Sequence, residues 1–169
     1  MANFVALFDA CVLSPASVRD LLLRLALTDL FRARWTDRIH DEWIGGVLKR
    51  RRDLSKAQLE RARDLMNQAV PDCLVTAYES LIDGLHLPDP DDRHVLAAAI
   101  RCQAGVIVTY NLKHFPEDAL APYGPFFNAG SRRSVDSALL IDQPRLPAVP
   151  VVRRQRKLTP RRHAELTPS

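Results

Sequence analysis

The sequence is short of the glycine patterns that build several common sites. It has 6 glycines in 169 residues, and none falls in a G-x-G-x-x-G or G-x-x-x-x-G-K-[ST] arrangement. A dinucleotide-binding loop and a P-loop both need such glycines, because the backbone must approach the phosphates closely. The sequence therefore argues against a dinucleotide-dependent enzyme and against a P-loop ATPase.

Cysteine is also scarce. Cys11, Cys73 and Cys102 are odd in number and widely spaced, so they form neither a disulfide framework nor the paired spacing of a zinc site. We interpret them as reduced cysteines packed as small hydrophobic side chains. Because no histidine or asparagine arrangement accompanies Cys11, we do not expect a thiol nucleophile.

Long hydrophobic runs are missing as well. The apolar run FVALF at residues 4–8 has no basic segment before it and is followed at once by Asp9. It is too short to span a membrane and lacks the features of a signal peptide. We therefore expect a cytoplasmic protein without a membrane partner.

Charge is divided unevenly along the chain. The net charge is +4, but residues 132–169 hold nine Lys and Arg against three Asp and Glu, which leaves 15 against 17 for the rest. The last segment also contains five prolines. We predict one domain over residues 1–130 and a basic, proline-containing tail over residues 131–169.

The hydrophobic pattern alternates between strand and helix. FVALF and GVIVTY (105–110) are short apolar runs typical of central parallel strands. Helix-start patterns occur at Ser14-Pro15, Thr36, Ser55 and about Asp91. We therefore expect an α/β fold with a central parallel sheet.

Acidic and amide side chains follow these elements. Asp9 and Asn111 come at the carboxyl ends of the two strands, where the reactive groups of parallel sheets collect. Glu42 borders the inner face of the second helix, and Asp89, Asp91 and Asp92 precede the fourth. Several carboxylates in one cleft repel one another unless a cation is bound, and oxygen ligands favour Mg²⁺ or Mn²⁺. Phosphodiester hydrolysis by a metal-activated water is the reaction such a site suits.

The aspartate cluster has a second interpretation. In LPDPDDRHVLAAAI (87–100), Asp89 fits a helix N-cap, Pro90 the first helical position, and Asp91 and Asp92 would complement the helix dipole. Both interpretations hold together if different members of the cluster serve them. The residues alone leave open which member of the cluster serves which role.

Four blocks resemble the PIN-domain ribonucleases, and more closely the VapC-type toxins that share a DRHVLAAA segment. They are FDACVLSPASVRDLLLRLA, WTDRIHDEW, LPDPDDRHVLAAAI and VIVTYNLKHFP, in that order. The resemblance implies a three-layer α/β/α fold and a Mg²⁺- or Mn²⁺-dependent endoribonuclease. It also implies an RNA substrate, a cognate antitoxin protein and a homodimer.

The resemblance implies catalytic and metal-binding roles for Asp9, Glu42 and Asp92, which leaves the helix N-cap to Asp89 and an auxiliary ligand role to Asp91. The fourth acidic position is Asn111 in this chain, and a neighbouring position that is often Asp is His114. Asn111 can still ligate a metal or position a water through its carbonyl. We interpret His114 as a surface histidine, and His94 as a packing and hydrogen-bonding residue.

Basic residues that flank the motifs are candidates for RNA binding, because phosphate contacts dominate nucleic-acid affinity. They are Arg19, Arg93 and Lys113.

Two other functions were weighed. A PIN-like module that binds RNA or protein but has lost turnover is the alternative that Asn111 and His114 leave open. A phosphohydrolase with an aspartyl nucleophile would need a second Asp two residues after Asp9, where this chain has Cys11.

Overall fold

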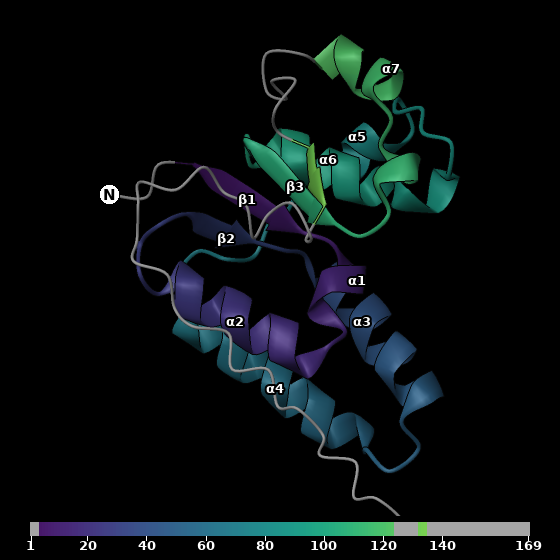
Figure 1. Ribbon diagram of the computed structural model, residues 1–169. Helices are drawn as coiled ribbons and strands as arrows, with labels where there is room; N and C mark the ends of the chain where they lie inside the picture. Colours follow the sequence, from purple (N-terminus) through teal and green to yellow (C-terminus); the bar gives the residue numbers. More distant parts are fainter. Residues whose placement is uncertain (1–3, 124–131, 135–169) are drawn as a thin grey trace, which may run out of the picture.

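A parallel sheet lies at the centre of the fold. The computed structural model describes residues 4–123 and 132–134. In these residues four strands pair in the order β2-β1-β3-β4, each pair parallel: β1 (Val5–Phe8), β2 (Arg32–Arg34), β3 (Val106–Thr109) and β4 (Arg132–Ser134). Helices cover both faces of the sheet (Figure 1), which confirms the expected α/β/α architecture.

The strands agree in part with the sequence expectations. β1 and β3 coincide with the two apolar runs and pair with each other in parallel, as predicted. β2 was not expected, because its sequence is Arg-Ala-Arg and only Ala33 is buried. β4 falls in the segment predicted as a tail; the rest of that segment lies outside the described residues, so the boundary at residue 130 stays a prediction.

The helices of the first half lie on one side of the sheet (Figure 1). They are α1 (Ala10–Leu13), α2 (Ala16–Ala26), α3 (Asp37–Arg50) and α4 (Lys56–Ala69). The predicted starts of α3 and α4 are confirmed: Thr36 accepts a hydrogen bond from the backbone of Ile39, and Ser55 forms a capping box with Gln58. The predicted start of α2 is one residue too early, since Pro15 is its N-cap and Ser14 ends α1.

The second half supplies the helices on the other side. They are α5 (Glu79–Ile82), α6 (Arg93–Arg101) and α7 (Glu117–Leu120), with the 3₁₀ turns η1 (Pro90–Asp92), η2 (Leu112–His114) and η3 (Ala121–Tyr123). Every residue of α6 from His94 to Ala99 is buried. The small alanines let this helix pack closely against β1. Among the described residues no helix is both long and apolar enough to cross a membrane.

A polar network ties α3 and α4 together inside the core. Trp43 Nε1 donates to His40 Nδ1 at 2.9 Å, so His40 carries its proton on Nε2, which faces Asn67 Oδ1 at 3.0 Å. Trp35 Nε1 donates to the same Asn67 oxygen at 2.8 Å. Trp35, His40 and Trp43 are fully buried, so one amide oxygen satisfies two buried N–H donors.

Replacing Asn67 by Leu removes this shared acceptor. Because Trp35 and His40 would each keep a buried donor without a partner, we expect the free energy of unfolding to fall by about 2 kcal/mol. Urea denaturation measures the change. Gln68→Leu, at an exposed position of the same helix, should alter stability by less than about 0.5 kcal/mol; equal losses in both variants would contradict the assignment.

The buried His40 should make stability depend on pH. Burial lowers the pKa of His40 below its ordinary value of 6.5. The unfolded chain therefore takes up a proton near pH 6.5 that the folded chain resists, and the free energy of unfolding falls as the pH drops below that value. The slope from one such group is at most about 1.4 kcal/mol per pH unit.

Urea unfolding at pH 7.5 and at pH 5.5 measures this loss. His40→Gln should reduce the difference between the two pH values, whereas His86→Gln, at an exposed position, should leave it unchanged. If both variants keep the pH dependence of the natural chain, His40 is not its source.

Candidate metal centre at the carboxyl end of the sheet

Asp9 lies buried at the carboxyl end of β1, where it caps α1. Its Oδ1 accepts a hydrogen bond from the backbone of Ala10 at 2.6 Å. Its Oδ2 accepts from Thr109 Oγ1 of β3 at 2.7 Å and from Cys11 Sγ at 3.2 Å. The carboxylate is 4% exposed, and no Lys or Arg of the described residues forms an ion pair with it. A buried carboxylate without a cationic partner favours a bound cation.

Asn111 reaches the same edge from β3. Its backbone N–H donates to Thr109 Oγ1 at 2.9 Å, so Thr109 links Asn111 to Asp9. The structure therefore brings the backbone of Asn111 to the same sheet edge as Asp9, as predicted. The amide oxygen of Asn111 offers a further oxygen ligand of the hard type that a carboxylate also provides.

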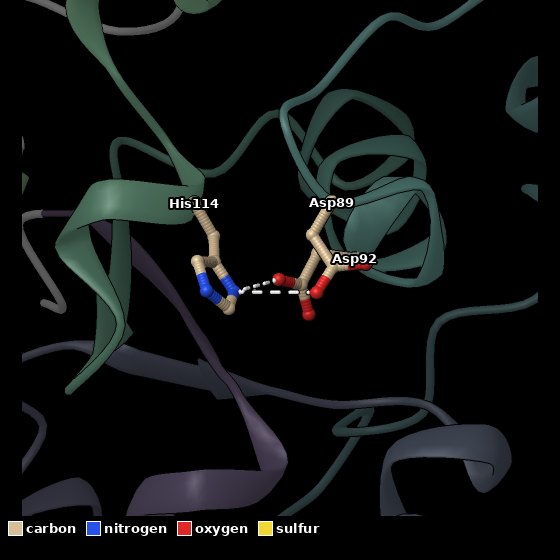
Figure 2. Close-up of side chains that lie close together, drawn as sticks. All are labelled: Asp89, Asp92 and His114. Carbon is tan, nitrogen blue, oxygen red and sulfur yellow. Dashed lines mark hydrogen bonds and ion pairs between the residues drawn. The ribbon is translucent and has the colours of Figure 1, made fainter.

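Three side chains gather at the start of α6 (Figure 2). His114 Nδ1 of η2 lies 2.5 Å from Asp92 Oδ2 and 3.8 Å from Asp89 Oδ2. One ligand atom from each of the three lies within 4.8 Å of the others. Asp89 also performs the predicted capping role, since its Oδ1 accepts from the backbone of Asp91 at 3.0 Å. Asp91 is exposed and outside the cluster.

The surroundings of Asp92 disfavour the ionised form of its carboxyl group. Burial raises the pKa of Asp92, and the negative charge of Asp9 raises it further, although the hydrogen bond from His114 lowers it. The net effect is a raised pKa. Because the negative charges of Asp9 and Asp92 repel each other, a cation bound between β1 and α6 would stabilise the ionised form of both carboxyl groups.

Glu42 approaches from α3. His94 Nε2 lies 2.9 Å from Glu42 Oε1, and Arg38 Nε lies 3.3 Å from the same oxygen. Partial burial alone would raise the pKa of Glu42, but the hydrogen bonds from His94 and Arg38 hold it below its usual value. Glu42 is therefore ionised at neutral pH and is tied to α6 through His94, which confirms His94 as a packing and hydrogen-bonding residue.

The structure brings the predicted ligands together only in part. The predicted ligands border the N-terminal end of α6 or the adjoining strand edge; they are Asp9, Glu42 and Asp92. Within the described residues, however, the group whose ligand atoms lie within 4.8 Å of one another consists of Asp89, Asp92 and His114. The sequence reasoning missed His114 as a member. The sequence did hold an indication of this role, because His114 occupies a position that is often Asp in the family that the chain resembles.

The predicted RNA-binding residues have different surroundings. Arg19 is 9% exposed; its Nη1 donates to Leu13 O at 2.6 Å, and its guanidinium lies 4.6 Å from the Trp43 ring centre. Arg93 donates to Pro90 O at 3.0 Å, and Lys113 is exposed. Of the three, Lys113 is the most accessible to a phosphate, while Arg19 serves packing first.

A cavity of about 480 Å³ opens beside this edge of the sheet. Cys11 and Tyr110 line it next to Asp9 and Asn111, and Arg19, Arg50 and Arg51 line it from α2 and the end of α3. Burial, together with the charge of Asp9, raises the pKa of Cys11 to about 11. The thiol therefore stays protonated at neutral pH, in agreement with the absence of a thiol nucleophile.

The donor set fits a hard divalent cation. Asp9, Glu42 and Asp92 offer carboxylate oxygens and Asn111 an amide oxygen, the ligand types that Mg²⁺ and Mn²⁺ take. Burial, and after it the charge of Asp9, raises the pKa of Asp92, and a bound cation would favour the ionised form of this carboxyl group. The imidazole of His114 is a ligand type that Zn²⁺, Cu²⁺ and Ni²⁺ take more readily than Mg²⁺ or Mn²⁺.

The comparisons with known proteins agree with this geometry. A Mycobacterium tuberculosis protein named "Putative ribonuclease VapC50" is 54% identical over 59 residues, which are 32% of this chain and 34% of the relative. The chain thus aligns with about a third of that relative's length. No solved structure gave a significant match. The model of the PIN-domain family matches residues 5–113, which include Asp9, Glu42, Asp92 and Asn111. The chain therefore belongs to the PIN-domain family.

Proposed function

We propose that this chain is a divalent-metal-dependent endoribonuclease that hydrolyses phosphodiester bonds of RNA. The observation that carries the proposal is the buried carboxylate of Asp9, which has no Lys or Arg partner among the described residues and lies near Asp92 at the carboxyl end of the sheet, in a chain of the PIN-domain family. The relative's name, which describes a ribonuclease, supports the substrate class.

In this proposal Asp9, Glu42 and Asp92 hold the cation, with Asn111 as a fourth, neutral ligand and Asp91 as an auxiliary one. When bound, Mg²⁺ or Mn²⁺ would lower the pKa of a water and stabilise the charge that develops on the phosphate. Thr109 fixes Asp9 by donating to its Oδ2, so one carboxylate orientation is set before substrate arrives. Arg93 and Lys113 flank the centre and would bind neighbouring phosphates, with Arg19 acting from the cavity wall.

The biological role follows from the VapC likeness. We infer that the chain is the toxin of a toxin–antitoxin pair, acts on RNA in the cytoplasm, forms a homodimer and is held inactive by a cognate antitoxin. The predicted tail from residue 131 is basic and would add attraction for a polyanion.

A binding module without turnover remains the second candidate. It is favoured by the 2.5 Å contact between His114 and Asp92, because a hydrogen bond from His114 occupies a carboxylate oxygen that the cation needs. The two candidates differ in one measurable property, since only the nuclease cuts RNA in the presence of a metal.

Asp9→Asn should abolish cleavage while preserving the fold. The amide keeps the size of the side chain and an oxygen for the cap, but it loses the negative charge that binds the cation. We expect the rate of cleavage of a mixed RNA substrate in Mg²⁺ or Mn²⁺ to fall by about 100-fold or more.

The matched control is Asp20→Asn, which changes an exposed aspartate of α2 and should cut RNA like the natural chain. EDTA should stop the reaction in both active forms. A folded natural chain that is inert in every metal would instead support the binding module.

His114→Asp should strengthen Mg²⁺ binding. The change removes the hydrogen bond that competes for Asp92 and adds a carboxylate to the centre, and divalent-ion affinity rises with ligand charge. We expect the Mg²⁺ dissociation constant from isothermal titration calorimetry to fall by about tenfold, equivalent to about 1.4 kcal/mol.

His86→Asp adds the same charge at an exposed position that is not a member of the cluster and should leave the constant within about twofold, because an exposed charge is screened by solvent and salt. If the two variants bind Mg²⁺ equally, His114 does not border the ion.

A further inference from the structure

His94 is a buried histidine with a single polar partner in the described part of the chain. It is the second residue of α6 and is 1% exposed. Its Nε2 lies 2.9 Å from Glu42 Oε1, while its Nδ1 is buried with no hydrogen-bond partner among the described residues. An imidazole that only filled space in the core would not need to point a ring nitrogen at a carboxylate.

The contact assigns the tautomer. An ionised carboxylate only accepts hydrogen bonds, so Nε2 must carry the ring proton when it faces Glu42. In the neutral ring Nδ1 is then an acceptor, which is the less costly group to leave without a partner in the core. The side chain is therefore oriented by one bond, and that bond points at Glu42.

We propose that His94 is a positioning residue, which fixes the carboxylate of Glu42 so that its second oxygen faces the metal centre. The proposal rests on the proposed function, since it assigns Glu42 as a ligand. His94 and Arg38 both contact Oε1 of Glu42, and Oε2 has no hydrogen-bond partner within the described residues. One oxygen is anchored and the other is left for a cation.

The anchor is more rigid than the second contact to the same oxygen. Arg38 reaches Oε1 from the same helix at 3.3 Å, but its side chain is 46% exposed, and exposed i,i+4 pairs contribute little. His94 belongs to α6, on the other side of the sheet, and is 1% exposed. Its bond therefore fixes α3 to α6 at the point where both carry a proposed ligand.

The segment DDRH explains the arrangement in sequence terms. Asp92 precedes His94 by two residues, at the N-cap of α6. The start of this helix thus offers one carboxylate directly and holds another through an imidazole. Outer partners that orient a metal ligand are expected to change metal affinity when removed.

The experiment compares His94→Gln with His94→Asn in the full chain. The side-chain nitrogen of Gln occupies nearly the position of imidazole Nε2 and can still donate to Glu42, whereas that of Asn corresponds to Nδ1 and cannot reach it. Binding of Mn²⁺ is followed by loss of the electron paramagnetic resonance signal of the free ion, which requires no RNA and no activity.

We expect His94→Asn to weaken Mn²⁺ binding by about 10- to 100-fold and His94→Gln to keep it within about threefold of the natural chain. Arg38→Ala, which removes the exposed partner of the same oxygen, should also stay within about threefold. In a Glu42→Gln background the difference between Asn and Gln at position 94 should vanish. Thermal unfolding of each variant identifies the folded forms to be compared.

Each contrary result has a distinct meaning. If His94→Gln binds as weakly as His94→Asn, or if Arg38→Ala weakens binding as much as His94→Asn does, the positioning role of His94 is overturned while the metal centre stands. If His94→Asn does not fold, the inference rests on His94→Gln and Arg38→Ala, and a loss in the Gln variant overturns it. If the natural chain binds no Mn²⁺ and cuts no RNA, the proposed function fails and this inference fails with it.

Discussion

The parallel pairing of β1 with β3 is the constraint on which the rest of the site depends. The register joins Phe8 to Val108, and the next backbone N–H, that of Asp9, donates to Val108 O at 3.1 Å. This pairing brings Thr109 next to Asp9, one hundred positions earlier in the chain, and Thr109 donates a hydrogen bond to the Asp9 carboxylate. A shift of one residue would turn Asp9 to the other face of the sheet, because side chains alternate along a strand. The sheet register therefore decides whether there is an acidic centre at all.

The start of α6 serves folding and chemistry at the same time. Pro90 and Asp89 begin the 3₁₀ turn that leads into the helix, and the six buried residues from His94 to Ala99 fix the helix against the sheet. Rigid packing of this kind holds Asp92 where burial, and after it the negative charge of Asp9, raises the pKa of its carboxyl group. The packing of the core thus offsets the repulsion between the two carboxylates, and a bound cation would reduce that repulsion.

Histidine recurs where one element of the fold contacts a polar side chain of another through a directed hydrogen bond. His40 connects two helices through a tryptophan and an asparagine. His94 connects the α3 carboxylate to α6, and His114 faces the aspartates at the start of that helix. For the buried His40 and His94, an imidazole supplies this bond without the large desolvation cost of a lysine or an arginine in the core. The bond of His94 joins helices from the two sides of the sheet.

The sequence by itself determined the elements whose signals are local. Apolar runs marked β1 and β3, and caps such as Thr36 and Ser55 marked α3 and α4, because a cap and a hydrophobic period are read from neighbouring residues. The ordered motifs also pointed to the PIN family and to Asp9, Glu42 and Asp92. Local signals could not reveal β2, where two arginines surround a single buried alanine and only its pairing with β1 makes a strand. Nor could they show that His114 faces Asp92 or that His94 holds Glu42, since each contact joins elements far apart in the chain. Those contacts were decided by the tertiary structure, because only the packing of α6 against the sheet and α3 brings the side chains within hydrogen-bonding distance.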